Sequence, residues 1–308
     1  MTAPTAGRRL TVNLVSRDNG VGLTADMELL EAMLAGAGHQ VARVDWRAPA
    51  MARCDVAIFL ELWAPRLARY ARKTVGVFNL EWFQNGWARD LSKLTQLWAK
   101  SQESYAVYQR LRMRNATLTG FLSRDLYDPA VAREATALHL RGHSDFKNTD
   151  RVIEAWRLDP TLPPLTIISA VPLHVPDYVR VLGRISDEEL RFEMNRASIH
   201  VCPSRAEGWG HYITEALSVG ALVVATDASP MNEHVHPDWG ALVPVASSAR
   251  HGLVSVSNVS ARQLSETIRT AAAIPAIWRA GMREKARAHF EARNASFTET
   301  ALSLLARI

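Results

Sequence analysis

The chain is poor in cysteine, with only two among its 308 residues, Cys54 and Cys202. Both lie at the edges of apolar runs, so we expect buried free thiols and no disulfide framework or cysteine-based metal site. No apolar stretch approaches the roughly 20 residues that a membrane span needs. The first nine residues also contain no apolar run of signal-peptide length. These absences favour a cytoplasmic protein.

Low-complexity segments and short internal repeats are also lacking, which argues against solenoid and disordered classes. Hydrophobic residues make up 48% of the chain and charged residues 22%. This composition is ordinary for a globular protein with substantial cores. The length suffices for two domains of about 150 residues each.

Positive charge is unevenly distributed. Residues 1–128 carry 17 Lys and Arg against 12 Asp and Glu, whereas residues 129–308 carry 19 of each. The excess therefore lies in the first part of the chain. It fits a solvated basic surface or a surface that meets something acidic, such as a membrane, a phosphorylated carrier or a nucleic acid.

Apolar strand-like runs alternate with helical patterns along the whole chain. The first part predicts strands at 10–16, 41–46, 56–62, 75–80 and 94–99, and helices at 24–37, 65–73 and 102–114. The second part predicts strands at 137–140, 165–169, 178–182, 197–202, 220–225 and 240–245. Its helices are expected at 149–156, 187–195, 261–273 and 275–308, the last with a break near Asn294.

This alternation is typical of parallel sheets covered on both faces. We therefore predict an α/β protein with two Rossmann-like, doubly wound domains that face a central cleft. The expected boundaries are 1–128 for an N-terminal domain and 129–290 for a C-terminal domain. Residues 291–308 are expected to form a C-terminal helix that crosses back to the first domain.

The most informative segment is PSRAEGWGHYITEALSVG, residues 203–220. A strand runs into a Pro-Ser turn, a glycine-flanked loop and an amphipathic run that ends at Gly220. This layout is typical of the point in an α/β sheet where a helix N-terminus and loop amides face a ligand. Glu215 would lie where it can accept hydrogen bonds from a ribose diol, and Glu207 beside a sugar. Alone, two such glutamates also fit a solvated helix face.

Residues 201–235, VCPSRAEGWGHYITEALSVGALVVATDASPMNEHV, resemble the nucleotide-sugar site of GT-B glycosyltransferases, specifically glycosyltransferase family 4. That family has a Pro-Ser turn, a Glu-x7-Glu motif, a glycine-terminated helix, a Val-Val strand and a later glutamate. The resemblance covers residues 136–245, and the first part of the chain matches only in architecture. It implies a retaining hexosyltransferase that takes a UDP-sugar or GDP-sugar donor, with no metal and no prosthetic group.

The resemblance also implies roles for individual residues. Arg141 and Lys147 resemble the family's basic pair on the diphosphate, although they stand one residue further apart than in the family. Two cations there can stabilise the negative charge that grows as the sugar departs. Glu233 would contact the donor sugar or close a helix end, and His211 would pack or touch ligand. The implied donor-binding residues are Arg141, Lys147, Arg184, Ile185, Ser204, Glu207, Gly208, Trp209, Gly210, His211, Thr214 and Glu215.

In the first part, Gly20 and Gly22 belong to the loop at 17–22 after the first strand. As a dinucleotide fingerprint they are weak, because a third glycine and a well-placed acid are missing. The resemblance implies instead that this loop closes over the phosphates and sugar. Glu81 follows the 75–80 strand as a candidate catalytic contact to the acceptor hydroxyl, or as a structural salt bridge. Family members often have a histidine in this region, and this sequence has none.

Basic residues and tryptophans are interleaved in the first part of the chain. Such interleaving suits phosphate binding, base stacking or a lipid interface, with solvated arginines and core tryptophans as the alternative. The residues are Arg66, Arg69 and Lys73 on one face of the expected 65–73 helix, then Arg110, Arg112 and Arg114, with Trp63, Trp82 and Trp87 nearby.

The sequence leaves the acceptor open between a lipid-linked glycan and a modified nucleic-acid base, and no obligate protein partner is evident. Two other functions also remain open. One is a nucleotide-sugar epimerase or a phosphorylase on the same fold. The other is a nucleic-acid-binding protein with a vestigial sugar site.

Overall fold

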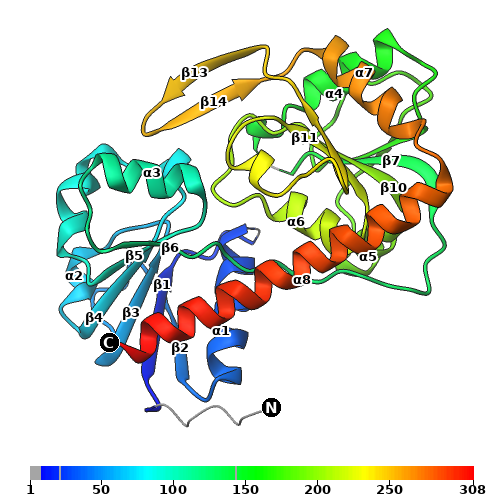
Figure 1. Ribbon diagram of the computed structural model, residues 1–308. Helices are drawn as coiled ribbons and strands as arrows, with labels where there is room; N and C mark the ends of the chain where they lie inside the picture. The colour runs from blue at the N-terminus through cyan, green and yellow to red at the C-terminus, as the bar shows by residue number, and fades with distance from the viewer. Residues whose placement is uncertain (1–7, 21, 143) are drawn as a thin grey trace. The chain divides into compact units, whose positions relative to one another are not determined.

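The computed structural model describes residues 8–20, 22–142 and 144–308. The chain divides into two compact units. Unit 1 comprises Met1–Ser123, Gly252–Val254 and Arg293–Ile308, and unit 2 comprises Arg124–His251 and Ser255–Ala292. Each unit contains one six-stranded sheet (Figure 1). The α/β class with two Rossmann-like, parallel-sheet domains is thereby confirmed.

The sheet of unit 1 is parallel throughout, in the order β2-β1-β3-β4-β5-β6. The strand order reverses between β1 and β3, so the loops that follow these two strands diverge and leave a crevice at their carboxyl ends. The strands are β1 (Thr11–Ser16), β2 (Gln40–Asp45), β3 (Cys54–Leu60), β4 (Ala71–Val77), β5 (Gln96–Ala99) and β6 (Ala116–Leu118). The helical segments are α1 (Gly22–Gly36), α2 (Pro65–Ala68), α3 (Gln102–Arg110) and the 3-10 segments η1 (Leu80–Trp82) and η2 (Asn85–Lys93).

The sheet of unit 2 is also parallel, in the order β12-β11-β10-β7-β8-β9. Its order reverses between β7 and β10, which creates a second crevice at carboxyl ends. The strands are β7 (Glu134–Leu140), β8 (Leu165–Ile168), β9 (Arg180–Leu182), β10 (Ala197–Cys202), β11 (Leu222–Thr226) and β12 (Gly240–Val243). The helices are α4 (Thr149–Leu158), α5 (Asp187–Arg196), α6 (His211–Ser218), α7 (Ala261–Ala272) and α8 (Ala276–Ala306), with 3-10 segments η3 (Asp145–Lys147) and η4 (Met231–Glu233).

Each sheet has its own apolar core. In unit 2, Trp156 of α4 and Leu264 and Ile268 of α7 are buried in one cluster with β7, β8 and β10. Strands covered on both faces read as near-continuous apolar runs, which is why the alternation in the sequence predicted them well. Cys54 and Cys202 are buried free thiols, as expected. Burial raises the pKa of the Cys54 thiol to about 11.

One expected helix is much shorter than predicted. The predicted helix at 65–73 ends at Ala68, because the next buried apolar run belongs to β4, which begins at Ala71. Arg66, Arg69 and Lys73 therefore do not share one helical face. The helix predicted at 24–37 is confirmed as α1, which begins two residues earlier, at Gly22; in the loop before it, position 21 lies outside the described residues.

The predicted C-terminal helix at 291–308 is the end of a longer one. Helix α8 runs unbroken from Ala276 to Ala306, so the expected break near Asn294 is wrong. No glycine or proline interrupts it after Gly281. The Asn294 side chain serves another purpose, since it accepts from the backbone N–H of Ser123 and donates to its carbonyl oxygen. No helix in the described part of the chain is long and apolar enough to cross a membrane.

One strand and one hairpin escaped the sequence patterns. β6 has only three residues. A hairpin pairs β13 (Ser247–His251) with β14 (Val254–Asn258), and every residue of β13 is exposed. Short or exposed strands carry little apolar signal, so periodicity does not reveal them.

Unit 1 buries an ion pair between its sheet and its first helix. Lys100, which follows β5, lies 2.7 Å from a carboxylate oxygen of Asp26 on α1. The two side chains are 1% and 3% exposed. The Lys100 ammonium also lies 4.2 Å from the ring centroid of Phe121. A pair this deeply buried depends on both partners, because either charge alone would be strongly destabilising.

We expect Asp26→Ala to lower the free energy of unfolding by about 3–5 kcal/mol, since it leaves the Lys100 charge buried and unpaired. The double variant Asp26→Leu with Lys100→Met should recover most of that loss. Chemical denaturation of the single and double variants measures both effects. If the double variant loses as much unfolding free energy as the two single substitutions add up to, burial of the lone charge is not the cause of the loss.

Candidate active site

The crevice of unit 2 brings two distant loops together. One loop follows β7 and contains Arg141 and Lys147, and the other follows β10 and contains residues 203–210. The backbone N–H of Arg205 donates to the carbonyl oxygen of Phe146 at 2.8 Å and joins the two loops directly. Ligands of open α/β sheets bind at such a reversal of strand order, so this crevice is the first candidate for a binding site.

A compact polar cluster lies between these loops. The ammonium of Lys147 is 2.6 Å from a carboxylate oxygen of Glu207, and the Ser204 hydroxyl donates to the same oxygen at 2.6 Å. Lys147 also lies 3.7 Å from the ring centroid of Tyr212. Burial, the largest cause, raises the pKa of Tyr212 well above its ordinary value, so this phenol stays neutral. The cluster therefore holds one cation and one anion in a partly desolvated place.

Arg141 lies at the other end of the β7 loop. Its guanidinium donates to the Gly142 carbonyl oxygen at 3.2 Å and to the carboxylate of Asp145 at 3.3 Å. The Asp145 side chain is 92% exposed, so it offers little competition to a ligand. The structure thus places Arg141 and Lys147 on the same short loop, in spite of the extra residue between them.

A buried histidine on β7 joins three elements of unit 2. The ring nitrogens of His139 lie 2.7 Å from the Val201 carbonyl oxygen of β10 and 2.9 Å from the Thr149 hydroxyl of α4. Burial, the largest cause, lowers the pKa of His139 to about 4, and the charges of Lys147 and Arg141 contribute in the same direction. The imidazole is therefore neutral, and it ties β7 to β10 and α4.

The glycine loop ends at the first turn of α6. Gly210 has φ +94° and is the N-cap residue, a conformation that an L side chain rarely adopts. The Trp209 ring is 3% exposed and packs edge-on to the His234 ring at 4.5 Å. The hydroxyl of Thr214 bonds to the His211 carbonyl oxygen at 2.9 Å. These side chains fix the loop, and the backbone amides of Gly208–Gly210 remain the groups suited to a ligand.

Glu215 is buried on α6, with a side chain 6% exposed. Its Oε1 accepts from Nε of Arg124 at 2.7 Å. Arg124 lies 91 residues earlier, on the segment between the two sheets, and no local pattern points to it. Sequence reasoning therefore missed the partner of the glutamate that it had singled out.

The remaining candidates lie on loops at the same edge of the sheet. Arg184 and Ile185 follow β9, the edge strand, and Arg184 is exposed. Glu233 lies in η4 after β11, and its carboxylate accepts from the Ser229 hydroxyl. All these residues follow carboxyl ends of parallel strands, so unit 2 gathers them at one edge while the sequence spreads them over about 100 positions.

Unit 1 has a polar group at its own crevice. Glu61, directly after β3, is 6% exposed and adopts φ +59°. Its carboxylate accepts from Arg17 at 3.0 Å and from the Asn79 amide at 3.1 Å. A non-glycine residue in the left-handed region at a strand end is often functional. The sequence prediction took Glu61 as a strand residue, although an acid that ends an apolar run was a usable signal.

The predicted residues of unit 1 follow carboxyl ends of strands in the same sheet. The Gly20 amide donates to Asp18 at 3.0 Å and to Thr24 at 2.8 Å, which closes the loop after β1 upon itself. Gly22 is the first residue of α1, and Glu81 is half-buried in η1 after β4. Among the described residues, no three His, Cys, Asp or Glu side chains are gathered as a metal site.

Comparisons with known proteins agree with this architecture. Residues 170–289 match the family model described as "Glycosyl transferases group 1". No match to a curated protein was found. The fold is similar to that of the Anabaena protein HepE in complex with UDP-glucose, with a TM-score of 0.71 and 15% identity over 97% of this chain and 100% of that one.

Two other solved structures share the fold. Sucrose-phosphate synthase from Thermosynechococcus elongatus matches with a TM-score of 0.76 and 15% identity over 97% of this chain and 99% of that one. A glycosyltransferase from Rickettsia africae matches with a TM-score of 0.74 and 13% identity over 96% and 97%. At these identities the likeness shows the fold, which is the GT-B arrangement of two Rossmann-like domains.

The buried His139 makes stability depend on pH. Its pKa is about 4 in the folded protein, against about 6.5 in an unfolded chain, so acid protonates the unfolded state first. Its contribution is complete above pH 6.5 and is lost as the pH falls toward 4. At pH 5 we expect a loss of about 2 kcal/mol. The difference in unfolding free energy between pH 7 and pH 5 should be smaller by that amount in His139→Gln. An equal difference in both proteins would contradict this assignment.

Proposed function

We propose that this protein is a glycosyltransferase that moves a sugar from a UDP-sugar to an acceptor hydroxyl, with retention at the anomeric carbon and without a metal ion. One observation carries the proposal. Arg141, Lys147, Glu207, Glu215 and the glycine loop converge where the strand order of unit 2 reverses. The family match over residues 170–289 and the UDP-glucose complex of a similarly folded protein support it.

The roles follow from the charges. Arg141 and Lys147 would neutralise the diphosphate and stabilise the charge that grows as the sugar leaves. The amides of Gly208–Gly210, at the N-terminus of α6, would bind phosphate oxygens or sugar hydroxyls. Glu207 would orient the donor sugar, and Glu215 would accept from the ribose hydroxyls. Two cations and several amides are enough to offset about two negative charges, so the reaction needs no divalent metal at this place.

On this proposal, positioning and electrostatics supply most of the acceleration. The diphosphate departs through an oxocarbenium-like state, and the acceptor hydroxyl enters on the same face of the sugar. Glu81 and Glu61 of unit 1 are the carboxylates that we assign to the acceptor side. The anomeric configuration of the product, measured by NMR, tests retention. Release of an epimer or of free sugar without an acceptor would favour the epimerase or phosphorylase alternative instead.

We expect Lys147→Met to lower kcat about 100-fold, because it removes one preorganised cation from the leaving group. Donor KM should change less. The measurement is the steady-state rate of UDP release that depends on an added acceptor, with UDP-glucose and other UDP-sugars as donors. Lys285→Met is the matched control, since Lys285 forms an exposed ion pair with Asp238 at 2.9 Å outside the crevice. Equal kcat in the Lys147 variant and the wild type would remove this residue from the mechanism.

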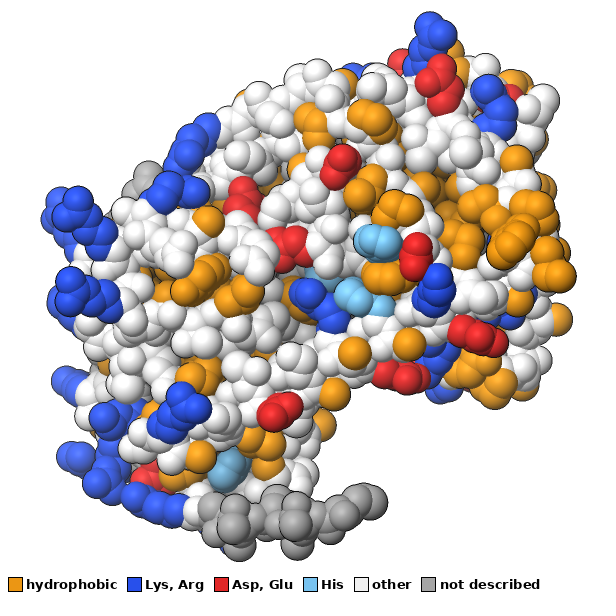
Figure 2. Space-filling view, in the orientation of Figure 1, with side chains coloured by type: hydrophobic (Ala, Val, Ile, Leu, Met, Phe, Trp, Pro, Cys, Tyr) orange, Lys and Arg blue, Asp and Glu red, His pale blue; other side chains and the backbone are white. Residues whose placement is uncertain are grey.

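A basic surface on unit 1 indicates what kind of partner the protein meets. Unit 1 carries 18 Lys and Arg against 11 Asp and Glu. Eight exposed cations precede or begin strands of its sheet, so they lie at the edge opposite the crevice, and we call them the basic rim. They are Arg8, Arg9, Arg53, Arg69, Arg72, Lys73, Arg112 and Arg114. Figure 2 shows Lys and Arg side chains along the left margin of unit 1.

The basic rim contains a cavity of about 350 Å³, lined by Arg53, Arg69, Arg72 and the carboxylate of Asp55. Asp55 already pairs with Arg8 at 2.8 Å. In the described part of unit 1, the large exposed apolar side chain is Trp82, which follows β4 and so lies away from the rim. We therefore propose that the rim holds the protein on an anionic lipid surface by charge alone, near a membrane-borne acceptor.

The combined variant Arg53→Gln, Arg69→Gln and Arg72→Gln should weaken binding to phosphatidylserine vesicles at least about tenfold, since each charge contributes about 1 kcal/mol at such a surface. Binding by the wild type should fall with ionic strength. Vesicle co-sedimentation measures both effects. The control removes the same charge from unit 2 through Arg151→Gln, Arg157→Gln and Arg262→Gln. Binding that ignores salt and the rim variant, or that occurs with duplex DNA and not vesicles, would refute the lipid assignment.

A further inference from the structure

Glu215, the carboxylate that the proposed function assigns to the ribose, is paired with Arg124 in the structure. Glu215 is 6% exposed and Arg124 is 35% exposed, with Nε of the arginine 2.7 Å from Oε1 of the glutamate. Among the residues that the structure describes, Oε2 of Glu215 has no side-chain partner. A carboxylate that binds a ribose diol in bidentate fashion uses both oxygens. Arg124 therefore occupies one of the two carboxylate oxygens of Glu215 that a ribose diol would use.

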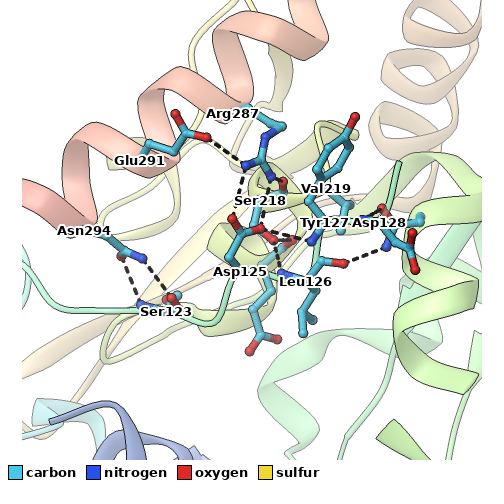
Figure 3. A network of polar contacts seen from close by, with 12 residues as sticks. Ser123, Asp125, Leu126, Tyr127, Asp128, Ser218, Val219, Arg287, Glu291 and Asn294 are labelled. Carbon is cyan, nitrogen blue, oxygen red and sulfur yellow. Dashed lines mark hydrogen bonds and ion pairs between the residues drawn. The ribbon is translucent and has the colours of Figure 1, made fainter. Parts of the chain in front are cut away.

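Ser123, Asp125 and Leu126, which flank Arg124 in the chain, each make hydrogen bonds or ion pairs with other segments (Figure 3). Ser123 exchanges two hydrogen bonds with the Asn294 side chain, at 3.1 and 2.9 Å. Asp125 forms a bidentate ion pair with Arg287 of α8, at 3.0 and 3.1 Å. The N–H of Leu126 donates to the Ser218 hydroxyl at the end of α6 at 3.1 Å.

These anchors have two consequences. Within unit 2, the contacts of Asp125 and Leu126 hold this segment next to α6, and the Arg124 guanidinium reaches Glu215 from there. They also mean that Arg124 can leave Glu215 through rotation of its own side chain, while the anchored backbone stays where it is. A side chain that is 35% exposed has solvent to move into.

We propose that Arg124 is a positioning residue that caps the ribose-binding carboxylate in the empty site and is displaced from it when the nucleotide binds. This inference rests on the proposed function, since it assumes that Glu215 binds the ribose. The cap neutralises a buried carboxylate that would otherwise be unpaired, a costly state. The nucleotide must then displace the cap, so the cap lowers affinity for ligands with a ribose diol and leaves ligands without one unaffected.

The site has a second example of the same arrangement. Lys147 pairs with Glu207 at 2.6 Å, so each glutamate of the motif carries a cation in the structure. The two cations differ in whether the ligand provides a new anionic partner. Lys147 can turn from Glu207 to the diphosphate, whereas Arg124 loses its partner to two neutral hydroxyls. The competition is therefore specific to the ribose end of the ligand.

The test is isothermal titration calorimetry of the full chain with UDP and with 2′,3′-dideoxy-UDP. We expect Arg124→Gln to bind UDP about five-fold more tightly than the wild type, because an ion pair with one solvated partner is worth up to about 1 kcal/mol. Affinity for the dideoxy compound should not change. Arg124→Lys keeps the charge and should lie between the two. Arg180→Gln is the matched control, because Arg180 pairs at 3.0 Å with the buried Glu193 outside the site.

The outcomes of this test distinguish a failure of the Arg124 cap from a failure of the proposed nucleotide site. Equal or weaker UDP binding by a folded Arg124→Gln would overturn the cap, and so would an equal gain for both nucleotides. Glu215→Gln should remove the preference for UDP over the dideoxy compound. If that preference survives, or if no variant binds UDP, the ribose role of Glu215 fails and the proposed nucleotide site fails with it. Thermal melts confirm that each variant is folded.

Discussion

The parallel pairing of β7 with β10 is the constraint on which the candidate site depends. These strands are 57 or more residues apart in the chain, yet their carboxyl ends lie side by side where the strand order reverses. The buried, neutral His139 reinforces the pairing through Val201 and Thr149. Because loops that leave neighbouring strands in opposite directions cannot fill the space between them, the fold itself creates the crevice.

Within that crevice, each glutamate of the motif is paired with a cation. Glu207 pairs with Lys147, and Glu215 pairs with Arg124. A partly buried site for a highly charged ligand would be unstable if its own charges were unpaired. Internal pairing avoids that cost in the empty site. On the proposed function, a ligand that supplies both phosphates and hydroxyls would replace both sets of contacts, so the same side chains would serve stability and selectivity.

The sequence predicted the long, buried elements well and the short, exposed ones poorly. β10 was placed at its observed bounds, since residues 197–202 are buried on both faces. The 65–73 helix was wrong because its charged residues fit helical spacing, while pairing with β3 makes residues 71–77 a strand. The break at Asn294 was wrong because an asparagine within a helix can direct its amide to another segment.

By itself, the sequence determined the α/β class, the parallel alternation and the motif with Glu207 and Glu215, because those depend on local patterns of apolar and polar residues. Only the tertiary structure decided which residues meet that motif. Arg124 and Lys147 reach it from distant positions, and Glu61 adopts φ +59° beside Arg17 and Asn79. Strand order brings such residues together, and no local spacing encodes strand order.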